Sequence, residues 1–493
     1  MALIIGNLSV TGGLKARTNS SPVWSTAATL TSVSANTAIN INLVATDPEN
    51  DTVVYTVAPA SSLPSGVSLS TGGALTSGSG LAGGVYTFTV RATDSLGAIK
   101  DRTFSLTSVV LTNWTTWNGS NDGTRFNAGS DVGNMGMTTS TLVDTDVTMV
   151  IYYDSSAGQT YAQLYTTSGK VITQNTRTSV YSSQPKSISC TALDATRVLF
   201  CYVDASNHVQ SIVLTISGTS ISVGSVTAID STFTSIGVTV VNMSTNVSVV
   251  TYFYNTSGPT NHIASAVITT NTNTISSVGT IEVTDGSSGF ANITTCPSSC
   301  KITSTKLFVI YGDGNNRVGT LGKIITVSGT TVTSGTPLAL TSVGNNSLNI
   351  TRNYSCCTLD STHVAVTYSE PFVNTSVTPG RTRVLSISGT TLTAGTEISI
   401  EAADTEQSII INNSSTGDGM VAIDASTYAI SYSYNVGTST RVSTYSVSGT
   451  TASRNTPVVI NGSITASYHS MVKLDANRLL NSLSNGLGIQ VLS

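Results

Sequence analysis

The sequence predicts an all-β protein in two parts, a small β-sandwich followed by a ring of seven four-stranded sheets. Short runs of β-branched and apolar residues alternate with turn residues along the 493-residue chain, as strands require. One short motif recurs at intervals of 50 to 64 residues. Hydrophobic residues make up 39% of the chain and charged residues only 9%. This composition argues against a disordered chain and indicates a polar, nearly uncharged surface.

Residues 21–109 carry the features of the sandwich, because short alternating strands are separated there by turn signals. This unit resembles the cadherin-like and immunoglobulin-type domains that are common in microbial surface and phage proteins. The segments that carry the likeness are 22–24, 40–51, 53–55, 63–66, 84–90 and 91–97. The resemblance covers nearly the whole unit and implies a small β-sandwich.

Residues 1–20 precede the sandwich. Within them the stretch 6–13 consists mainly of Asn, Gly, Ser and Thr, and it is similar to the short strand-and-turn segments at the attachment ends of tailed-phage fibres. We therefore interpret 1–20 as an N-terminal attachment segment, with an ordinary disordered leader as the alternative. Neither the charge nor the length of the apolar patch Ala2–Ile5 fits a secretory signal.

Residues 110–493 contain the recurring motif, a tyrosine that ends a short apolar run. The six tyrosines are Tyr152, Tyr202, Tyr252, Tyr311, Tyr368 and Tyr432. An anchor residue lies eight positions before each, and a seventh copy places Asp475 eight positions before Leu483. The other anchors are Asp144, Asp194, Ser244, Thr303, Asp360 and Asp424. A period of this length is typical of propellers, so the sequence predicts seven repeats.

The second copy shows how one repeat should fold. Four strand-like runs at 187–193, 197–202, 208–216 and 220–229 fill about fifty residues, and a Ser217-Gly218 turn joins the last two. Most other copies have the same Ser-Gly turn. Four strands per repeat are typical of a propeller blade, and closing the blades into a ring protects their edges.

Strands from both ends of the repeated region should close this ring. The seventh copy has only three predicted strands and ends at residue 493. The segment 123–129 resembles the fourth-strand segments 335–340 and 456–462 of other copies. We therefore predict that 123–129 pairs with the C-terminal strand.

Charge and cysteine content exclude several classes of function. The net charge is −4 and Lys and Arg form no cluster, so we expect no nucleic-acid partner. No apolar stretch approaches the ~18 residues that a membrane span needs, so we expect no membrane insertion. The six cysteines match no zinc-binding pattern, and we interpret them as packing residues or occasional disulfides.

Acidic residues in the sandwich suggest one metal site. Asp47, Glu49, Asp51 and Asp94 offer the oxygen ligands that calcium prefers. Only one domain of this type is present to supply ligands, so an ordinary acidic turn is the alternative interpretation. We expect no other cofactor.

The repeats contain no recognisable catalytic arrangement. Propellers host glycosidases, which need a carboxylate pair, but the anchor aspartates occupy equivalent positions in different repeats and should therefore lie far apart. We predict no catalytic residue and no enzyme. The recurring tyrosines should likewise be structural, with rings packed between blades and hydroxyls on polar partners.

Binding residues should instead lie in loops that break the repeat. The most irregular loop is 370–380, which contains two prolines. Candidate contact residues are Tyr354, Glu370, Phe372 and Tyr434, of which the three aromatic residues could stack on sugars.

These features together resemble a virion protein of a tailed bacteriophage, either a tail fibre or appendage protein or a capsid decoration. The resemblance implies a homo-oligomer exposed on the particle, assembled in the host cytoplasm and bound to other virion proteins through 1–20. It also implies host attachment by binding a surface glycan, or a role in particle assembly. The alternatives are a bacterial surface adhesin and a polysaccharide-degrading propeller enzyme.

Overall fold

The computed structural model describes residues 19–30, 33–34, 38–78, 81, 84–109, 125–126, 135–168, 171–232, 234–255, 261–279, 281–285, 296–312, 320–341, 354–369, 380–401, 409–410, 419–434, 439–455, 458–461, 468–475, 478–483 and 488–492. All 44 regular elements in these residues are strands, which confirms the all-β class. Within these ranges no helix is long and apolar enough to cross a membrane. The chain divides into two compact units, Met1–Asn113 and Trp114–Ser493.

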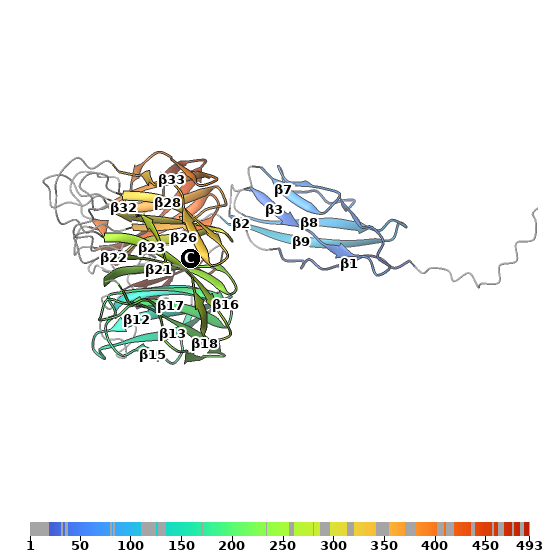
Figure 1. Cartoon of the computed structure of the whole chain (residues 1–493). Helices are drawn as coiled ribbons and strands as arrows, with labels where there is room; N and C mark the ends of the chain where they lie inside the picture. The colour runs from blue at the N-terminus through green and yellow to red at the C-terminus, as the bar shows by residue number, and fades with distance from the viewer. Residues whose placement is uncertain are drawn as a thin grey trace, which may run out of the picture. The chain divides into compact units, whose positions relative to one another are not determined.

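The first unit is a β-sandwich (Figure 1). Its strands are β1 (Val23–Trp24), β2 (Val33–Ser34), β3 (Ile39–Asn42), β4 (Ala45–Thr46), β5 (Val54–Val57), β6 (Ser68–Leu69), β7 (Ala74–Ser77), β8 (Gly84–Thr93) and β9 (Ile99–Val109). One sheet has the order β2-β9-β8-β5, another has the order β3-β7-β6, and β1 pairs with β4. The core is aromatic: the ring centroid of Trp24 lies 5.1 Å from that of Phe104 and 5.5 Å from that of Tyr55. Phe88 of β8 adds a further ring, 6.1 Å from that of Phe104, because buried residues alternate with partly exposed ones along this strand.

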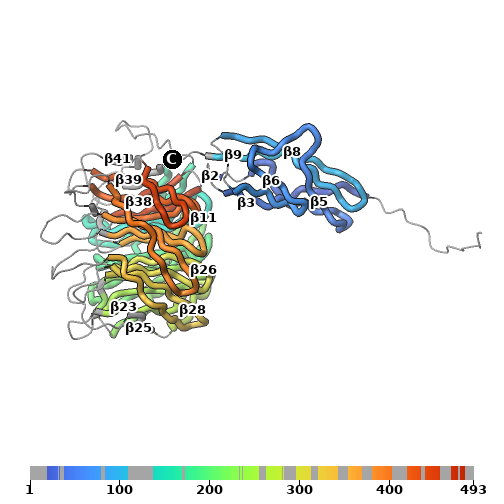
Figure 2. Tube along the Cα trace, turned by 90° about the horizontal axis from the view of Figure 1, so that it is seen from above, coloured from blue at the N-terminus to red at the C-terminus, as the bar shows by residue number. Residues whose placement is uncertain are grey.

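The described part of the second unit contains seven sheets, which we call blades 1 to 7 (Figures 1 and 2). Blade 1 contains β11 (Met135–Asp144), β12 (Val147–Asp154), β13 (Gln159–Ser168), β14 (Val171–Gln174) and β15 (Thr178–Tyr181). Blade 2 contains β16 (Ser187–Asp194), β17 (Arg197–Val203), β18 (Val209–Ser217), β19 (Ser220–Val223) and β20 (Thr227–Asp230). Blade 3 contains β21 (Thr234–Ser244), β22 (Val247–Asn255), β23 (Asn261–Thr270), β24 (Ile275–Val278) and β25 (Glu282–Asp285). Blade 4 contains β26 (Ser298–Thr303), β27 (Lys306–Gly312), β28 (Thr320–Ser328), β29 (Thr331–Ser334) and β30 (Leu338–Ala339).

The remaining blades follow the same plan. Blade 5 contains β31 (Tyr354–Thr358), β32 (His363–Ser369), β33 (Gly380–Ser388), β34 (Thr391–Ala394) and β35 (Ile398–Ser399). Blade 6 contains β36 (Ile409–Ile410), β37 (Met420–Asp424), β38 (Thr427–Tyr434), β39 (Ser439–Ser448), β40 (Thr451–Arg454) and β41 (Val458–Asn461). Blade 7 contains β42 (His469–Lys473), β43 (Leu479–Leu483), β44 (Gly488–Leu492) and β10 (Arg125–Phe126). Figure 2 shows the yellow, orange and red sheets following one another in chain order.

The blades form a closed ring. The inner strands β11, β16, β21, β26, β31, β37 and β42 contact one another in that order, and β42 also contacts β11. Blade 7 draws strands from both ends of the second unit, because Arg125 pairs with Gln490 and Phe126 pairs with Ile489 in antiparallel register. The predicted pairing of segment 123–129 with the C-terminal strand is therefore confirmed for residues 125–126.

The fourth strand of each repeat differs from the prediction. Residues 220–229 form two short strands, β19 and β20, which both pair with β18. The break falls at Gly224, whose amide donates a hydrogen bond of 3.0 Å to the carbonyl of Val213. A side-chain carbon at Gly224 would lie only 2.6 Å from the carbonyl oxygen of Asn273 in blade 3. In blade 2 a side chain at this position would clash with the next blade, so glycine is needed there.

The recurring tyrosines are buried where neighbouring blades pack together, as predicted. Five of the six are at most 1% exposed, and Tyr202 is 2% exposed. Tyr252, for example, lies in a hydrophobic core built from blades 2 and 3. Its hydroxyl donates a hydrogen bond of 2.9 Å to Asp230 Oδ2, at the end of β20. The tyrosines of blades 1 to 6 therefore lie in the cores that join each of these blades to the preceding one in the ring.

The anchor aspartates are turn residues. Asp194 Oδ1 accepts hydrogen bonds from the backbone amide and hydroxyl of Thr196, both at 2.8 Å. Asp360 and Asp424 make the corresponding amide bonds, at 2.6 and 2.7 Å. Because each aspartate closes the first hairpin of its own blade, these carboxylates are not paired in a common pocket.

The cysteines are free thiols in this structure, and all except Cys300 are buried. Burial raises the pKa of Cys357 well above its usual range. The thiol of Cys357 therefore remains protonated at neutral pH, as expected of a packing residue.

Candidate functional site

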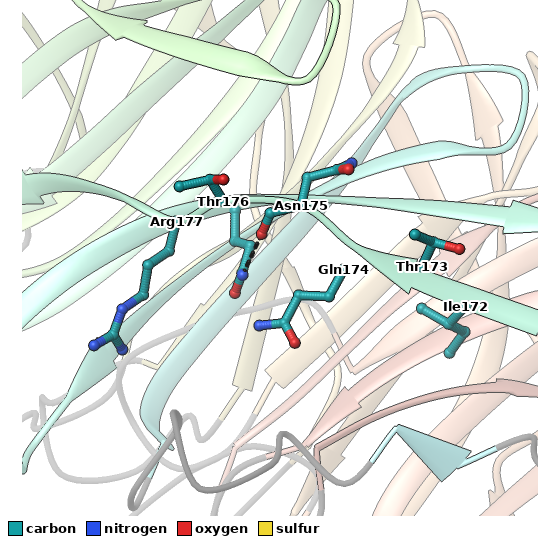
Figure 3. A pocket seen from close by; sticks show the side chains of 7 residues that line it. Ile172, Thr173, Gln174, Asn175, Thr176 and Arg177 are labelled. Atoms are coloured by element: carbon teal, nitrogen blue, oxygen red, sulfur yellow. Dashed lines mark hydrogen bonds between the residues drawn. The ribbon is translucent and has the colours of Figure 1, made fainter.

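A pocket of about 640 Å³ opens on blade 1 where the chain leaves β14 and enters β15. Its lining residues are Gln163, Ile172, Thr173, Gln174, Asn175, Thr176 and Arg177. Figure 3 shows that six of them come from one continuous segment, 172–177. The pocket therefore lies at the same interruption of the fourth strand that Gly224 produces in blade 2.

This segment folds like its counterparts in the other blades but carries different side chains. The amide of Asn175 donates a hydrogen bond of 3.0 Å to the carbonyl of Leu164, which is the bond that Gly224 makes to Val213. Two positions later blade 1 has Arg177, whereas blade 2 has Val226 and blade 4 has Pro337. Gln174 likewise stands where blade 2 has Val223. Blade 1 therefore has polar groups where blade 2 has exposed valines.

A buried amide forms the polar floor of the pocket. Gln163 is 2% exposed, and its Oε1 accepts hydrogen bonds from the hydroxyls of Tyr152, at 3.0 Å, and Tyr165, at 2.8 Å. Its Nε2 donates to the carbonyl of Asn175 at 2.6 Å, the bond drawn in Figure 3. Burial raises the pKa of both tyrosines, so they remain hydrogen-bond donors at neutral pH. The amide is therefore fixed in one orientation.

Arg177 supplies the cation of the pocket. Its Nη1 donates a hydrogen bond of 2.8 Å to Asp154 Oδ2, and its side chain is 31% exposed against 1% for Asp154. The guanidinium carbon lies 4.1 Å from the ring centroid of Tyr161, a cation–π contact. An acid on one side and an aromatic face on the other thus hold the guanidinium in place.

Asp154 is itself held by its neighbours. Its Oδ1 accepts hydrogen bonds from the amide and hydroxyl of Ser156, at 3.0 and 2.6 Å, and from the amide of Ala157, at 3.2 Å. Burial acts to raise the pKa of Asp154, but these bonds and the one from Arg177 outweigh burial and lower it. Asp154 and Arg177 are therefore both ionised at neutral pH, and their charges cancel.

One wall of the pocket is apolar and rests on the ring closure. Ile172 is 8% exposed and packs with Tyr152, Tyr165, Leu474 and Leu480 in a core shared by blades 1 and 7. The pocket consequently lies beside the junction between the first and last blades.

These groups favour recognition of polar ligands by hydrogen bonding. Amide, hydroxyl and guanidinium groups stand beside one apolar side chain, and polar groups of this kind fix the orientation of a ligand and give specificity. The described residues contain no group of three or more His, Cys, Asp or Glu side chains placed to hold a metal ion. None of the seven lining residues was predicted from the sequence. The available signal was the arginine at a position where other repeats have Val226, Ile281 or Pro337.

Two of the residues predicted to contact a ligand, Tyr354 and Tyr434, lie in blades 5 and 6. Tyr354 is 2% exposed and belongs to the core between blades 4 and 5, so the expectation of an exposed stacking ring there is wrong. It pairs with the buried Tyr368 across β31 and β32 and therefore shares the buried face. Tyr434 lies at the end of β38, with the guanidinium carbon of Arg441 3.8 Å from its ring centroid. Glu370 and Phe372 lie outside the described residues.

Two of the four candidate calcium ligands, Asp47 and Asp94, close turns of the sandwich, and the carboxylate of Glu49 accepts hydrogen bonds from the amide and hydroxyl of Ser20, at 3.0 and 2.7 Å. Asp47 Oδ1 accepts hydrogen bonds from the amides of Glu49, at 2.9 Å, and Asp51, at 3.1 Å. Asp94 Oδ1 accepts bonds of 2.9 Å from the amides of Leu96 and Ala98. These bonds are those of an ordinary acidic turn, and calcium binding stays a prediction.

A family match supports the fold of the first unit. Residues 21–109 match the family model described as "Putative Ig domain". No curated protein matches the sequence. The fungal lectin of Aleuria aurantia, a six-bladed β-propeller described as recognising fucose, is 11% identical, with a TM-score of 0.38 over 66% of this chain and 96% of its own.

Two further solved structures are similar at the same level. The SapL1 lectin, solved with α-methyl fucoside, is 12% identical, with a TM-score of 0.38 over 67% of this chain and 96% of its own. A protein from Bacteroides fragilis described as a putative 6-phosphogluconolactonase is 12% identical, with a TM-score of 0.45 over 71% of this chain and 91% of its own. The family match covers the immunoglobulin-type sandwich, and the seven described sheets of the second unit themselves form the β-propeller.

Proposed function

We propose that this chain is a binding protein whose propeller recognises a glycan in the pocket of blade 1. The observation that carries this proposal is the lining of the 640 Å³ pocket, in which Gln174, Thr173, Thr176 and Arg177 surround an opening above the buried amide of Gln163.

The chemistry of the lining fits a sugar. A sugar ring presents several hydroxyl groups, each able to donate and to accept hydrogen bonds, together with apolar C–H faces. Amide side chains such as Gln174 both donate and accept, hydroxyls do the same, and a guanidinium donates. Ile172 offers an apolar surface beside them. The fixed amide of Gln163 and the anchored Arg177 reduce the entropy lost when a ligand is bound.

The same proposal assigns the chain to the surface of a tailed-phage particle, as a tail fibre or appendage protein or a capsid decoration. The immunoglobulin-type unit at 21–109 would act as a spacer between the particle and the propeller. The immunoglobulin-type match and the low content of charged residues support this assignment, since few exposed ion pairs leave binding insensitive to salt.

A glycan array probed with the full chain tests the binding proposal. Neutral and acidic bacterial surface oligosaccharides should include at least one ligand, and Gln174→Ala or Arg177→Gln should weaken its binding at least tenfold. Val223→Ala and Val226→Ala are matched controls, because these exposed valines occupy the same two positions of blade 2. Retained binding in both pocket variants would refute the assignment to blade 1.

Two other measurements test whether the chain lies on a phage particle and whether it cleaves polysaccharide. Antibodies against residues 21–109 should label the surface of intact phage particles in electron micrographs, and unlabelled particles would contradict the virion assignment. Incubation with the bound polysaccharide should release no reducing ends. Steady release that Gln174→Ala abolishes would instead favour the polysaccharide-degrading alternative.

A further inference from the structure

We infer that the pocket of blade 1 selects uncharged sugars over acidic ones, and that Asp154 determines this selectivity. The inference rests on the proposed function and adds the chemical class of the ligand. It follows from the way in which the only cation of the described lining is already paired.

The pairing of Arg177 with Asp154 leaves fewer N–H groups of the guanidinium for a ligand carboxylate. Arginine recognises carboxylates most strongly when two of its N–H groups bind both oxygens side by side. Here Nη1 is committed to Asp154 at 2.8 Å, and the ring of Tyr161 lies 4.1 Å from the guanidinium carbon. A ligand carboxylate would therefore have to share the guanidinium with an existing carboxylate.

Asp154 is hard to displace. It is 1% exposed, and three hydrogen bonds from Ser156 and Ala157 hold it in the β12–β13 turn. An incoming anion would thus meet a fixed negative charge next to the guanidinium, and like charges at such distances repel. A neutral hydroxyl has no such penalty and needs only single hydrogen bonds.

Blade 5 shows the opposite arrangement at the equivalent position. Glu397 stands where blade 1 has Arg177, and it pairs with Arg383 at 2.5 Å and Arg381 at 3.8 Å. The hydroxyl of Tyr368 also donates to Glu397. Both blades therefore balance a charged residue at this turn with an opposite charge on the blade itself. In blade 1 the balanced pair borders the pocket.

The test compares matched sugars that differ only in charge. The full chain is assayed on arrays that carry oligosaccharides of neutral hexoses and the corresponding uronic acids. Wild-type protein should bind the neutral members at least tenfold more tightly. Asp154→Asn retains the size of the side chain but leaves Arg177 uncompensated, so binding of the uronic acids should rise about tenfold and should fall again at high salt.

The double variant Asp154→Asn/Arg177→Gln has neither charge of the pair, so its affinity for uronic acids relative to hexoses should return to the wild-type ratio even if both affinities are weaker. Far-UV circular dichroism confirms that each variant folds, and the wild-type comparison stands without any variant. If wild-type protein bound uronic acids as tightly as hexoses through Gln174, the inference would be wrong while the proposed function stood. A folded Asp154→Asn variant with unchanged selectivity would also overturn it. Binding of no sugar at all would refute the proposed function itself.

Discussion

The contact between each interrupted fourth strand and the next blade predicts a specific loss of stability when Gly395 is replaced by alanine. The new Cβ atom would lie 2.6 Å from Thr450 Cβ in blade 6 and 2.7 Å from the carbonyl oxygen of Val384. Real Cβ atoms do not approach other atoms so closely, and a backbone carbonyl is not free to move aside. Blades 5 and 6 would therefore have to separate locally.

The expected magnitude follows from two opposing effects. Overpacking of this kind costs about 1–3 kcal/mol, whereas alanine stabilises relative to glycine by about 0.4–1 kcal/mol because it restricts the unfolded chain. The net loss should be about 1–2 kcal/mol, or roughly 1–3 °C in melting temperature for a unit of this size. Gly335→Ala should cost less, because its Cβ would lie 2.9 Å from the carbonyl oxygen and 3.0 Å from the Cβ of Thr390.

Thermal unfolding followed by near-UV circular dichroism measures this effect. The matched control is Gly449→Asn in the turn that Gly395 approaches: Gly449 has φ 58° and open space around it, and asparagine tolerates this conformation. Its melting temperature should stay close to that of the wild type. The packing account fails if Gly395→Ala melts no lower than Gly449→Asn, or if Gly335→Ala is the more damaging of the two alanine variants.

Three further predictions concern the ring and its buried polar groups. Deleting 486–493 removes β44, and with it the partner of β10, so the propeller should melt at a clearly lower temperature in calorimetry; an unchanged transition would contradict closure by this strand. Tyr252→Phe leaves the buried Asp230 without the hydroxyl that binds it at 2.9 Å and should cost about 1–3 kcal/mol in urea unfolding; a neutral effect would show that the bond contributes nothing. The pKa of Asp154 is lowered in the folded state because hydrogen bonds outweigh the effect of burial. The ionised carboxylate therefore stabilises the fold fully above the ordinary carboxyl pKa, and this stabilisation is lost as the pH falls through the lowered pKa. Urea midpoints between pH 6 and pH 2.5 should therefore fall less in Asp154→Asn than in the wild type, and equal slopes would refute this.

The architecture of the ring could be predicted because it repeats. The tyrosine and its anchor recur at matching positions, so one signal was observed several times, and the copy without a fourth strand indicated where the ring closes. The interruption of the fourth strand was missed because Gly224 stands within a run of β-branched residues that reads as one strand. The break is visible only in the backbone hydrogen bonds, which run from Gly224 to Val213 in blade 2 and from Asn175 to Leu164 in blade 1.

The candidate site could not be predicted because it depends on residues that do not repeat. The pocket depends on Gln174 and Arg177, which depart from the repeat in one blade, and on their three-dimensional relation to Asp154 and Gln163. Periodicity hides such single departures. Tyr354 was misjudged because its nearness to a long loop suggested exposure, whereas its cross-strand pairing with Tyr368 places it in the core.

Isothermal titration of the full chain with the glycan that binds most tightly on the array decides whether the pocket of blade 1 is the binding site. Wild-type protein and the blade 2 control Val223→Ala should bind with the same affinity, and Gln174→Ala should bind at least tenfold more weakly because it loses hydrogen bonds to the sugar, roughly 1.4 kcal/mol or more. Equal affinity in all three proteins would show that the glycan binds elsewhere and that the pocket of blade 1 is not the site.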